Sequence, residues 1–310
     1  MDGQAAGRRR FDVLGLGAVA VDDLLVVDEF PRPDGKTPVQ AQERAGGGLA
    51  GTALVAAARL GARAGFCAVL GDDDLSRFTL DELEREGVDI SPVVRRPGAR
   101  PIHSVIIVCR GRPERSILFS SAGVQPPTAA DLPESLIAAS QVLLVDHTVA
   151  AAAIHAAAVA RARGIPVVGD LERHDFPEQS DFLNSIDHLI VSQEWARTLT
   201  GEDKPAVAAR ALLTRGHAAV VVTAGAEGSV YALPGRAPTH VPALRVPVVD
   251  TTGCGDVFHG AYAACLAWGG DVHAAVRVAT VAAGLKTRHA GGRAGIPTRA
   301  EVEGELGRVA

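Results

Sequence analysis

The chain has 310 residues, of which 47% are hydrophobic and 22% are charged. This balance excludes an intrinsically disordered chain, which needs low hydrophobicity and high net charge. A net charge of −5 gives no basic surface for nucleic acid, and aromatic residues, at 4%, are too few for base-stacking platforms.

Apolar runs that stop at glycines predict strands and helices along the whole chain. Residues 11–27 are predicted to form one or two strands, and residues 37–45 an extended segment. The other predicted strands are 64–70, 102–108, 116–119, 142–145, 167–168, 188–191 and 219–222. The predicted helices are 49–60, 75–86, 150–162, 206–213, 254–268 and 272–286.

From residue 142 onward strands and helices alternate, which is typical of a parallel sheet covered on both faces. The early strands have no helices between them and predict a small β-sheet lid, formed by about residues 14–44 and 102–119. We therefore expect the 310 residues to form one α/β domain with a lid.

The basic N-terminal segment resembles the start of a signal peptide, but Asp12 interrupts the apolar run after it. We interpret residues 1–10 as a disordered tail. Four cysteines and ten histidines show no spacing typical of disulfides or metal sites, which predicts a reduced, cytoplasmic protein. No apolar run approaches the ~20 residues that span a membrane, so no membrane partner is expected.

Two local motifs have structural explanations. Residues 15–20 match the GxGxxA fingerprint of dinucleotide-binding proteins, but a predicted strand follows where the fingerprint requires a helix. A nicotinamide-dependent oxidoreductase is a further alternative, which predicts NAD(P) binding. The acidic residues 72–74 are interpreted as a helix N-terminus rather than a metal site.

The most informative segment is residues 250–258, Asp-Thr-Thr-Gly-Cys-Gly-Asp-Val-Phe, before a long predicted helix. Its glycines free backbone N–H groups to converge on an anion, and the helix dipole adds positive potential. Asp256 has two interpretations, a first-turn acid favoured by the dipole or a base beside a phosphate site. Asp250 and Thr252 are either turn caps or oxygen ligands for a cation.

Residues 250–258 resemble the C-terminal signature of the ribokinase-like (PfkB) carbohydrate kinases, with Cys254 in place of the usual alanine. Residues 46–53 and 57–61 resemble the N-terminal signature of the family, and residues 222–228 resemble its nucleotide-binding strand and turn. The resemblance runs from about residue 11 to the C-terminus. It implies a three-layer α/β/α core with a mainly parallel sheet and a small β-sheet lid.

The resemblance also implies ATP-dependent phosphoryl transfer to a primary hydroxyl of a small sugar or sugar derivative, with Mg²⁺. Asp256 would be the base, and the anion hole would consist of Gly253, Cys254 and Gly255. The residues expected on the nucleotide side are Thr223, Gly225, Gly228, Ala283 and Lys286. Those expected on the sugar side are Asp22, Gly47, Gly48, Thr52 and Lys36. Asp250 and Thr252, with the backbone near Gly292 and Gly295, resemble a monovalent-cation site, for example for K⁺.

Four residues depart from the family pattern in ways that bear on the substrate or the metal. Thr52 and Ala20 stand where ribokinases often have asparagine, which weakens ribose as the specific substrate. Ser192 and Trp195 replace the two usual groups of a Mg²⁺-linked segment, which leaves Glu194 as a candidate. A branch that includes sulfofructose kinase is resembled by residues 47–53 with 256–261 and by residues 285–286 with 291–297, so a ketose, sulfo-sugar or sugar acid is expected.

Alternatives remain open from the sequence. A nucleoside kinase or a ribokinase would share the fold, and a non-catalytic sugar or nucleotide sensor is the alternative of another class. The exposed edge of the lid predicts a homodimer, because an unpaired sheet edge invites pairing.

Overall fold

The computed structural model describes residues 9–111 and 115–309. Most of the predicted tail, residues 1–8, lies outside the described residues. Arg9 and Arg10, which the prediction places in the tail, contact the body of the protein. Arg9 donates to the carbonyl of Ser140 at 2.6 Å, and Arg10 pairs with Asp89 at 2.7 Å.

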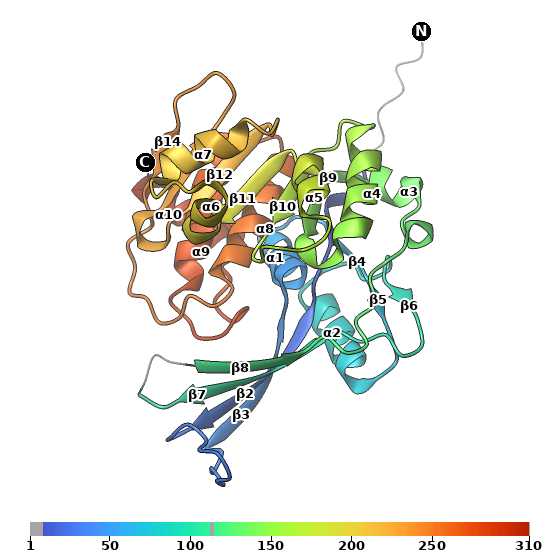
Figure 1. The fold of residues 1–310 in the computed structure, drawn as a ribbon, viewed down its shortest axis with the longest axis vertical. Helices are drawn as coiled ribbons and strands as arrows, with labels where there is room; N and C mark the ends of the chain where they lie inside the picture. Colours follow the sequence, from blue (N-terminus) through green and yellow to red (C-terminus); the bar gives the residue numbers. More distant parts are fainter. Residues whose placement is uncertain (1–8, 112–114, 310) are drawn as a thin grey trace.

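The described residues form a central sheet of eight strands, in the order β14-β13-β12-β11-β10-β9-β1-β4 (Figure 1). The six strands from β12 to β4 are parallel, and β13 and β14 join through antiparallel pairing. The strands are β1 Phe11–Leu16, β4 Ala64–Cys67, β9 Ser140–Asp146, β10 Val167–Asp170, β11 His188–Ser192, β12 Ala219–Thr223, β13 Ser229–Ala232 and β14 Thr239–Val241.

Helices cover both faces of this sheet. Side chains of a strand point alternately to opposite faces, so Val142 and Leu144 of β9 pack on one side and Leu143 and Val145 on the other. The first face is covered by α1 Leu49–Arg59, α8 Cys254–Ala267 and α9 Val272–Lys286. The second is covered by α4 Ala150–Arg161, α5 Gln179–Ser185, α6 Gln193–Thr200 and α7 Pro205–Leu213. The predicted three-layer α/β/α core is therefore confirmed.

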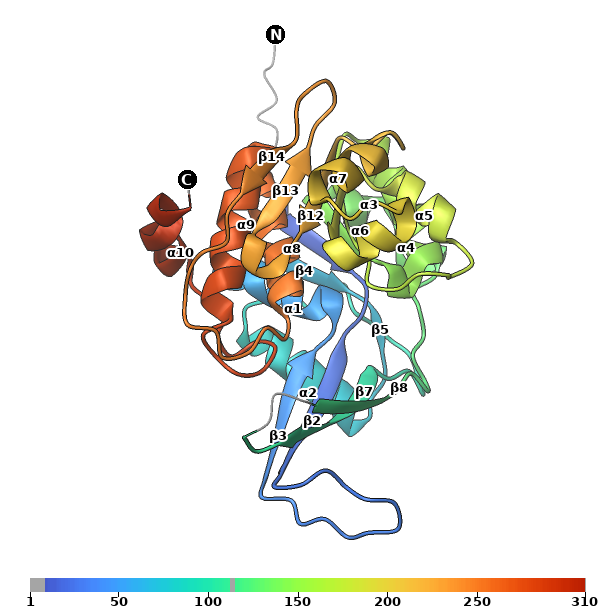
Figure 2. The same cartoon turned by 60° about the vertical axis from the view of Figure 1, so that its left-hand side comes forward.

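A second sheet projects from one end of this core (Figure 2) and forms the lid. Its order is β3-β2-β7-β8, with β2 Ala20–Val27, β3 Ala41–Gly47, β7 Ile102–Cys109 and β8 Arg115–Ser120. The predicted range 14–44 begins too early, because Leu14 and Leu16 pair with β4 and β9 in the central sheet. Residues 17–19 are the connection, so the end of β1 leads directly into the lid.

The remaining elements are short or lie outside the two main sheets. Apart from short 3₁₀ helices, they are α2 Asp74–Arg85, α3 Glu134–Ala138, α10 Arg299–Glu305 and the small pair β5 Val69–Leu70 and β6 Val94–Arg95. Asp73 accepts a hydrogen bond from the N–H of Ser76 and caps α2, which confirms the structural interpretation of the acidic run. The strand β2 after residues 15–20 confirms that this motif opens no helix. No helix in the described part of the chain combines the length and apolarity needed to cross a lipid bilayer.

Close packing of α1 on α8 places the start of α8 and gives a first prediction. A Cβ atom on Gly260 would lie 1.9 Å from the carbonyl oxygen of Ala53, so Gly260→Ala forces the two helices apart. We expect a loss of about 1–3 kcal/mol in the free energy of unfolding, measured by urea denaturation. Gly304→Ala in α10 is the matched control, because apart from its own helix turn no atom lies within 4 Å of the place where its side chain would begin. The control should gain up to about 1 kcal/mol from helix propensity, and equal effects of the two changes would contradict the packing argument.

Candidate active site

Candidate residues gather where the parallel strands end. β9 ends at Asp146, β10 at Asp170 and β12 at Thr223, and α8 begins beside them at Cys254. Ligands of open α/β sheets bind at the carboxyl ends of the strands, because these ends meet at one edge. The end of β1, which leads into the lid, lies at the same edge.

The predicted anion hole forms the N-terminus of α8. Gly253 is the N-cap residue and has a φ of 74°, a left-handed conformation that glycine adopts without steric cost. The N–H of Cys254 donates to the carbonyl of Thr251 at 3.2 Å. Gly255 is exposed, and apart from its own helix turn no atom lies within 4 Å of the place where its side chain would begin. An open helix start of this kind is suited to a phosphate.

Asp256 lies in the first turn of α8 with its side chain half-buried. Burial raises its pKa well above the ordinary 3.8, and the negative charges of Asp170 and Glu172 raise it further. The positive charge of Arg293 counteracts part of this rise. Asp256 is therefore a stronger base than an exposed aspartate.

His259, one turn further along α8, receives no role from the sequence. Its Nδ1 lies 2.8 Å from the carbonyl oxygen of Gly255 and 3.3 Å from Asp170 Oδ2, and its Nε2 lies 3.1 Å from the carbonyl oxygen of Ile190. Burial lowers the pKa of His259, and the hydrogen bonds with the carbonyl groups of Gly255 and Ile190 oppose this shift. The imidazole ties the helix start to β10 and β11. A histidine on the inward face of a helix, one turn after a predicted anion hole, is the signal that could have found it.

The predicted sugar residues Asp22, Gly47 and Gly48 lie together at the base of the lid. Burial raises the pKa of Asp22, whereas a hydrogen bond with Ser104 and the charge of Arg293 lower it. A Cβ atom on Gly47 would lie 2.4 Å from Asp22 Oδ2, so any side chain at this position would displace the Asp22 carboxylate. Gly48 caps α1, and Arg293 Nη2 donates to the carbonyl of Gly47 at 2.7 Å. A ligand bound here would contact the carboxylate of Asp22 and the backbone of Gly47 and Gly48.

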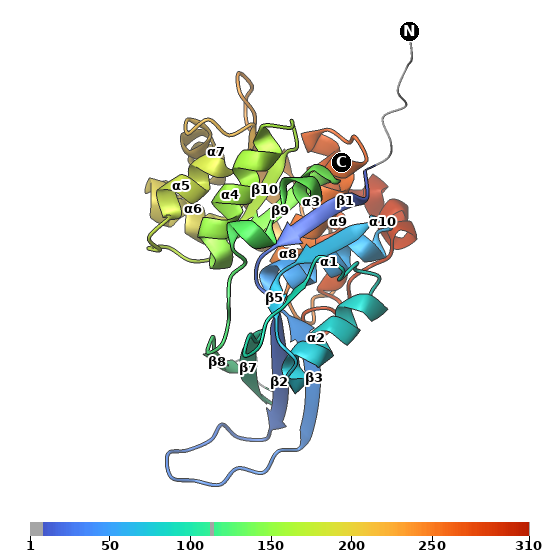
Figure 3. The ribbon, with the colours of Figure 1, turned by 90° about the vertical axis from the view of Figure 1, so that its right-hand side faces the viewer.

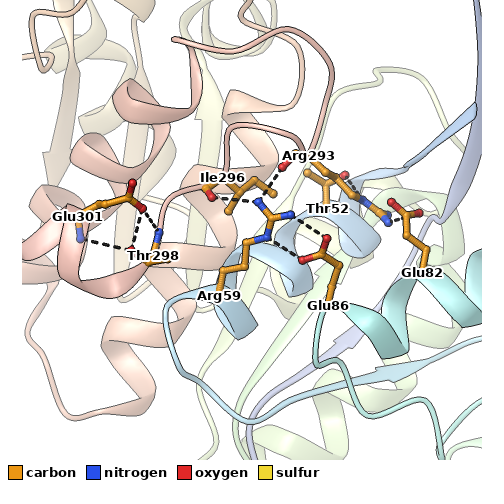
Figure 4. A network of polar contacts seen from close by, with 8 residues as sticks. All are labelled: Thr52, Arg59, Glu82, Glu86, Arg293, Ile296, Thr298 and Glu301. Atoms are coloured by element: carbon orange, nitrogen blue, oxygen red, sulfur yellow. Dashed lines mark hydrogen bonds and ion pairs between the residues drawn. The ribbon is translucent and has the colours of Figure 1, made fainter. Parts of the chain in front are cut away.

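A network of ion pairs and hydrogen bonds around Arg293 and Arg59 supports the backbone of Gly47 (Figure 4). Arg293 Nη1 pairs with Glu82 Oε2 at 3.0 Å, and its Nε donates to Thr52 Oγ1 at 3.3 Å. Arg59 holds Glu86 with two bonds of 2.7 Å and donates to the carbonyl of Arg293 at 3.1 Å. The loop after α9 is thereby joined to α1 and α2.

Two predicted sugar residues lie in other surroundings. Thr52 is 1% exposed, and its hydroxyl accepts a hydrogen bond from Arg293, so it supports the loop. Lys36 is exposed in the connection between β2 and β3, which extends from the lid away from the core (Figure 3). The structure does not bring Lys36 to Asp22 and Asp256.

A cavity of about 330 Å³ lies beside the start of α8. This volume suits a small-molecule ligand. Its lining includes residues predicted on the nucleotide side and two residues of the anion hole, namely Thr223, Gly225, Gly228, Ala283, Cys254 and Gly255. Lys286 is not among the lining residues, and its side chain is fully buried.

A second cavity, of about 460 Å³, shares Thr223 and Gly225 with the first and is lined by Glu194. Ser192 caps α6 by accepting a hydrogen bond from the N–H of Trp195 at 3.1 Å. Trp195 is 2% exposed and packs in the core. These two departures from the family pattern thus have local structural roles, and Glu194 is the exposed carboxylate of the segment.

An open helix start beside a raised-pKa carboxylate, next to a cavity of small-molecule size, is the arrangement that a small-molecule phosphotransferase needs. The model of the pfkB family carbohydrate kinases matches residues 11–299. The chain therefore belongs to the pfkB family, which confirms the resemblance, and it is a carbohydrate kinase. The comparisons give no support to the sensor alternative.

Individual proteins agree with this assignment. The ribokinase of Haemophilus influenzae is 27% identical over 296 residues, which cover 92% of this chain and 95% of that protein. A bifunctional ribokinase/ribose-5-phosphate isomerase A of Fructilactobacillus sanfranciscensis is 27% identical over 297 residues, and the chain spans only 54% of its length. The crystal structure of a putative ribokinase from Agrobacterium tumefaciens superimposes with a TM-score of 0.85 at 31% identity, covering 96% of this chain and 97% of that one.

Proposed function

We propose that this kinase transfers the γ-phosphoryl group of ATP to a primary hydroxyl of a small sugar or sugar derivative, and that the whole chain works as one kinase domain. The observation that supports this most strongly is the position of Asp256. It follows Cys254 and Gly255, which line the nucleotide cavity, and the charge of Arg293 acts on it as it acts on Asp22 of the sugar side.

The residues divide the chemistry between them. Asp256 takes the proton of the attacking hydroxyl, and its raised pKa favours that role near neutral pH. The backbone of Gly253, Cys254 and Gly255 stabilises charge on the transferring phosphoryl group at the helix N-terminus. Asp22 accepts hydrogen bonds from sugar hydroxyls and orients the sugar.

The nucleotide enters as its Mg²⁺ complex, since Mg²⁺ is held mainly by phosphates and water. Thr223, Gly225, Gly228 and Ala283 line the space for it. The exposed carboxylate of Glu194 on the adjoining cavity suits a water-mediated contact with that complex. When bound, Mg²⁺ neutralises charge on the phosphates.

The sugar is a ketose, a sulfo-sugar or a sugar acid in this proposal. A ribokinase remains the second candidate, because relatives named as ribokinases match almost the whole chain. Against ribose, the hydroxyl of Thr52 is already engaged by Arg293, and Ala20 offers no amide to a ligand. A nucleoside kinase is the remaining alternative on this fold.

A substrate panel tests the proposal. Purified enzyme with ATP and Mg²⁺ is offered ribose, fructose, sulfofructose, 2-keto-3-deoxygluconate and nucleosides, and ADP release is followed. We expect release with at least one ketose, sulfo-sugar or sugar acid. Release with ribose alone would favour the ribokinase, and binding without release from any of them would contradict the proposal.

The raised pKa of Asp256 predicts a pH dependence. A base acts when deprotonated, so activity falls as pH drops through its pKa, and a raised pKa moves this fall to higher pH. We expect kcat/KM, which reports the free enzyme, to decline well above the pH of about 4 at which an ordinary aspartate titrates. The measurement is kcat/KM against pH in overlapping buffers at constant ionic strength. A profile that stays flat down to that pH would contradict the role of Asp256.

We also propose a homodimer in the cytoplasm. β8 is the edge strand of the lid, and Ile117, Leu118 and Phe119 are exposed on it, which favours pairing with a second copy. The four cysteines are free thiols, in keeping with a reducing compartment. Sedimentation of the purified protein as a monomer would contradict the dimer.

A further inference from the structure

The side-chain oxygens that the resemblance assigns to a monovalent cation already have donors. Asp250 Oδ1 accepts hydrogen bonds from N and Oγ1 of Thr252 at 2.9 and 2.7 Å, and Oδ2 accepts one from the N–H of Gly291 at 2.8 Å. Thr252 Oγ1 also accepts from Arg115 Nη1 of β8 at 2.8 Å. The guanidinium of Arg115 lies 3.8 Å from Asp250 Oδ1. These side chains do not fit a metal ion.

A backbone oxygen of the same loop, the carbonyl of Asp250, accepts a hydrogen bond from a buried lysine. Lys286 Nζ donates to it at 3.3 Å from the last turn of α9, and its side chain is 0% exposed. The chain has three lysines, and the other two, Lys36 and Lys204, are exposed. Burying an ammonium group is unfavourable unless oxygen atoms and negative charges compensate for it.

The surroundings of Lys286 supply that compensation. Burial lowers the pKa of Lys286, whereas the charges of Asp250 and Asp256 raise it. Ala283 and Thr287, which are near Lys286 in the chain, line the nucleotide cavity, whereas Lys286 does not. The ammonium group therefore contacts the loop of residues 250–253 from the interior of the protein and not from the cavity.

Backbone hydrogen bonds also hold the start of this loop against the end of α9. The N–H groups of Val249 and Asp250 both donate to the carbonyl of Thr287, at 2.8 and 3.1 Å. A Cβ atom on Gly253 would lie 2.7 Å from the carbonyl oxygen of Gly292. Lys286 therefore stands where the anion-hole loop meets the chain after α9, which are the two segments that a bound cation would join.

We propose that the Lys286 ammonium group is a built-in cation for residues 250–255, so that this kinase needs no monovalent metal ion. An ammonium group and K⁺ carry the same charge, and both take oxygen neighbours. At this place the charge holds the carbonyl of Asp250 and adds positive potential behind the phosphate-binding helix start. The inference rests on the proposed role of this loop in phosphoryl transfer.

The test compares the wild-type enzyme with Lys286→Met, an unbranched side chain of similar length without charge. Both are assayed on the sugar that the wild type accepts, with Tris salts of the nucleotide, MgCl₂, and tetramethylammonium chloride to fix ionic strength. K⁺ or Li⁺ is then titrated in place of tetramethylammonium. The melting temperature of each protein is followed in the same titrations, which detects ion binding without turnover. Lys204→Met, at the exposed start of α7, is the matched control.

We expect wild-type kcat and melting temperature to be insensitive to K⁺. Lys286→Met should lose about tenfold or more in kcat without K⁺, and K⁺ but not Li⁺ should restore activity and raise its melting temperature. Lys286→Arg, which keeps the charge, should retain more activity than Lys286→Met. K⁺ activation of the wild type would overturn the inference, and so would a folded Lys286→Met that stays inactive with every ion. A wild type that phosphorylates no sugar would instead contradict the proposed function.

Discussion

Asp256→Asn will lower kcat by about 10²–10⁴-fold, the usual contribution of a general base, and will leave ATP binding intact. Asparagine keeps the shape of the side chain but cannot take a proton from the attacking hydroxyl. Asp256 is not part of the lining of the nucleotide cavity, so the loss should fall on the chemical step. Steady-state ADP release gives kcat, and calorimetric titration gives the Kd for ATP.

A structural role for Asp256 makes a different prediction. If the carboxylate only complements the helix dipole, asparagine costs about 0.3–1 kcal/mol of stability and leaves kcat unchanged. Asp271→Asn is the matched control, because Asp271 caps the next helix, α9, and asparagine caps a helix equally well. We expect this control to have wild-type stability and turnover. Wild-type kcat in Asp256→Asn would refute the proposed mechanism.

The parts of the site that follow from the sequence are those that lie close together along the chain. Residues 250–256 contain the helix start, the glycines and the acid in one segment, so local rules for helix N-termini place them correctly. The strand after Gly17 and the cap at Asp73 follow from equally local rules. The same holds for the alternation of strands and helices that gives the α/β/α core.

The parts that do not follow depend on contacts between distant segments. Arg293 meets Thr52 and Gly47 across 241 and 246 residues, and neither a repeat nor a spacing connects them. The sequence around Lys36 resembles a substrate-binding segment of the family. The position of Lys36 depends, however, on the path of the β2–β3 connection. Lys286 lies in the last turn of α9, and nothing in the local sequence indicates that it is buried. Its ammonium group reaches the carbonyl of Asp250 because the end of α9 packs against residues 249–250.

Arg293→Met is expected to be the most destabilising single change outside the catalytic residues. Arg293 is 4% exposed, and its partner Glu82 is also largely buried. Removing the guanidinium leaves the carboxylate without a counter-charge, which costs about 3–5 kcal/mol for a buried pair. Urea denaturation measures this loss. Replacing both members, with Arg293→Met and Glu82→Leu together, should recover most of it, because buried apolar pairs often match buried ion pairs in stability.

The same change should alter catalysis in a way that simple destabilisation does not. The charge of Arg293 lowers the raised pKa of Asp256, so its loss raises that pKa further and moves the acid limb of kcat/KM to higher pH. The loss of the 2.7 Å bond to the carbonyl of Gly47 should also raise KM for the sugar. Arg59→Met is the control, because Arg59 belongs to the same network but is not among the charges that act most strongly on Asp256. Arg59→Met should lose stability and keep the wild-type pH profile, whereas equal pH shifts in the two variants would show that Arg293 acts only through folding.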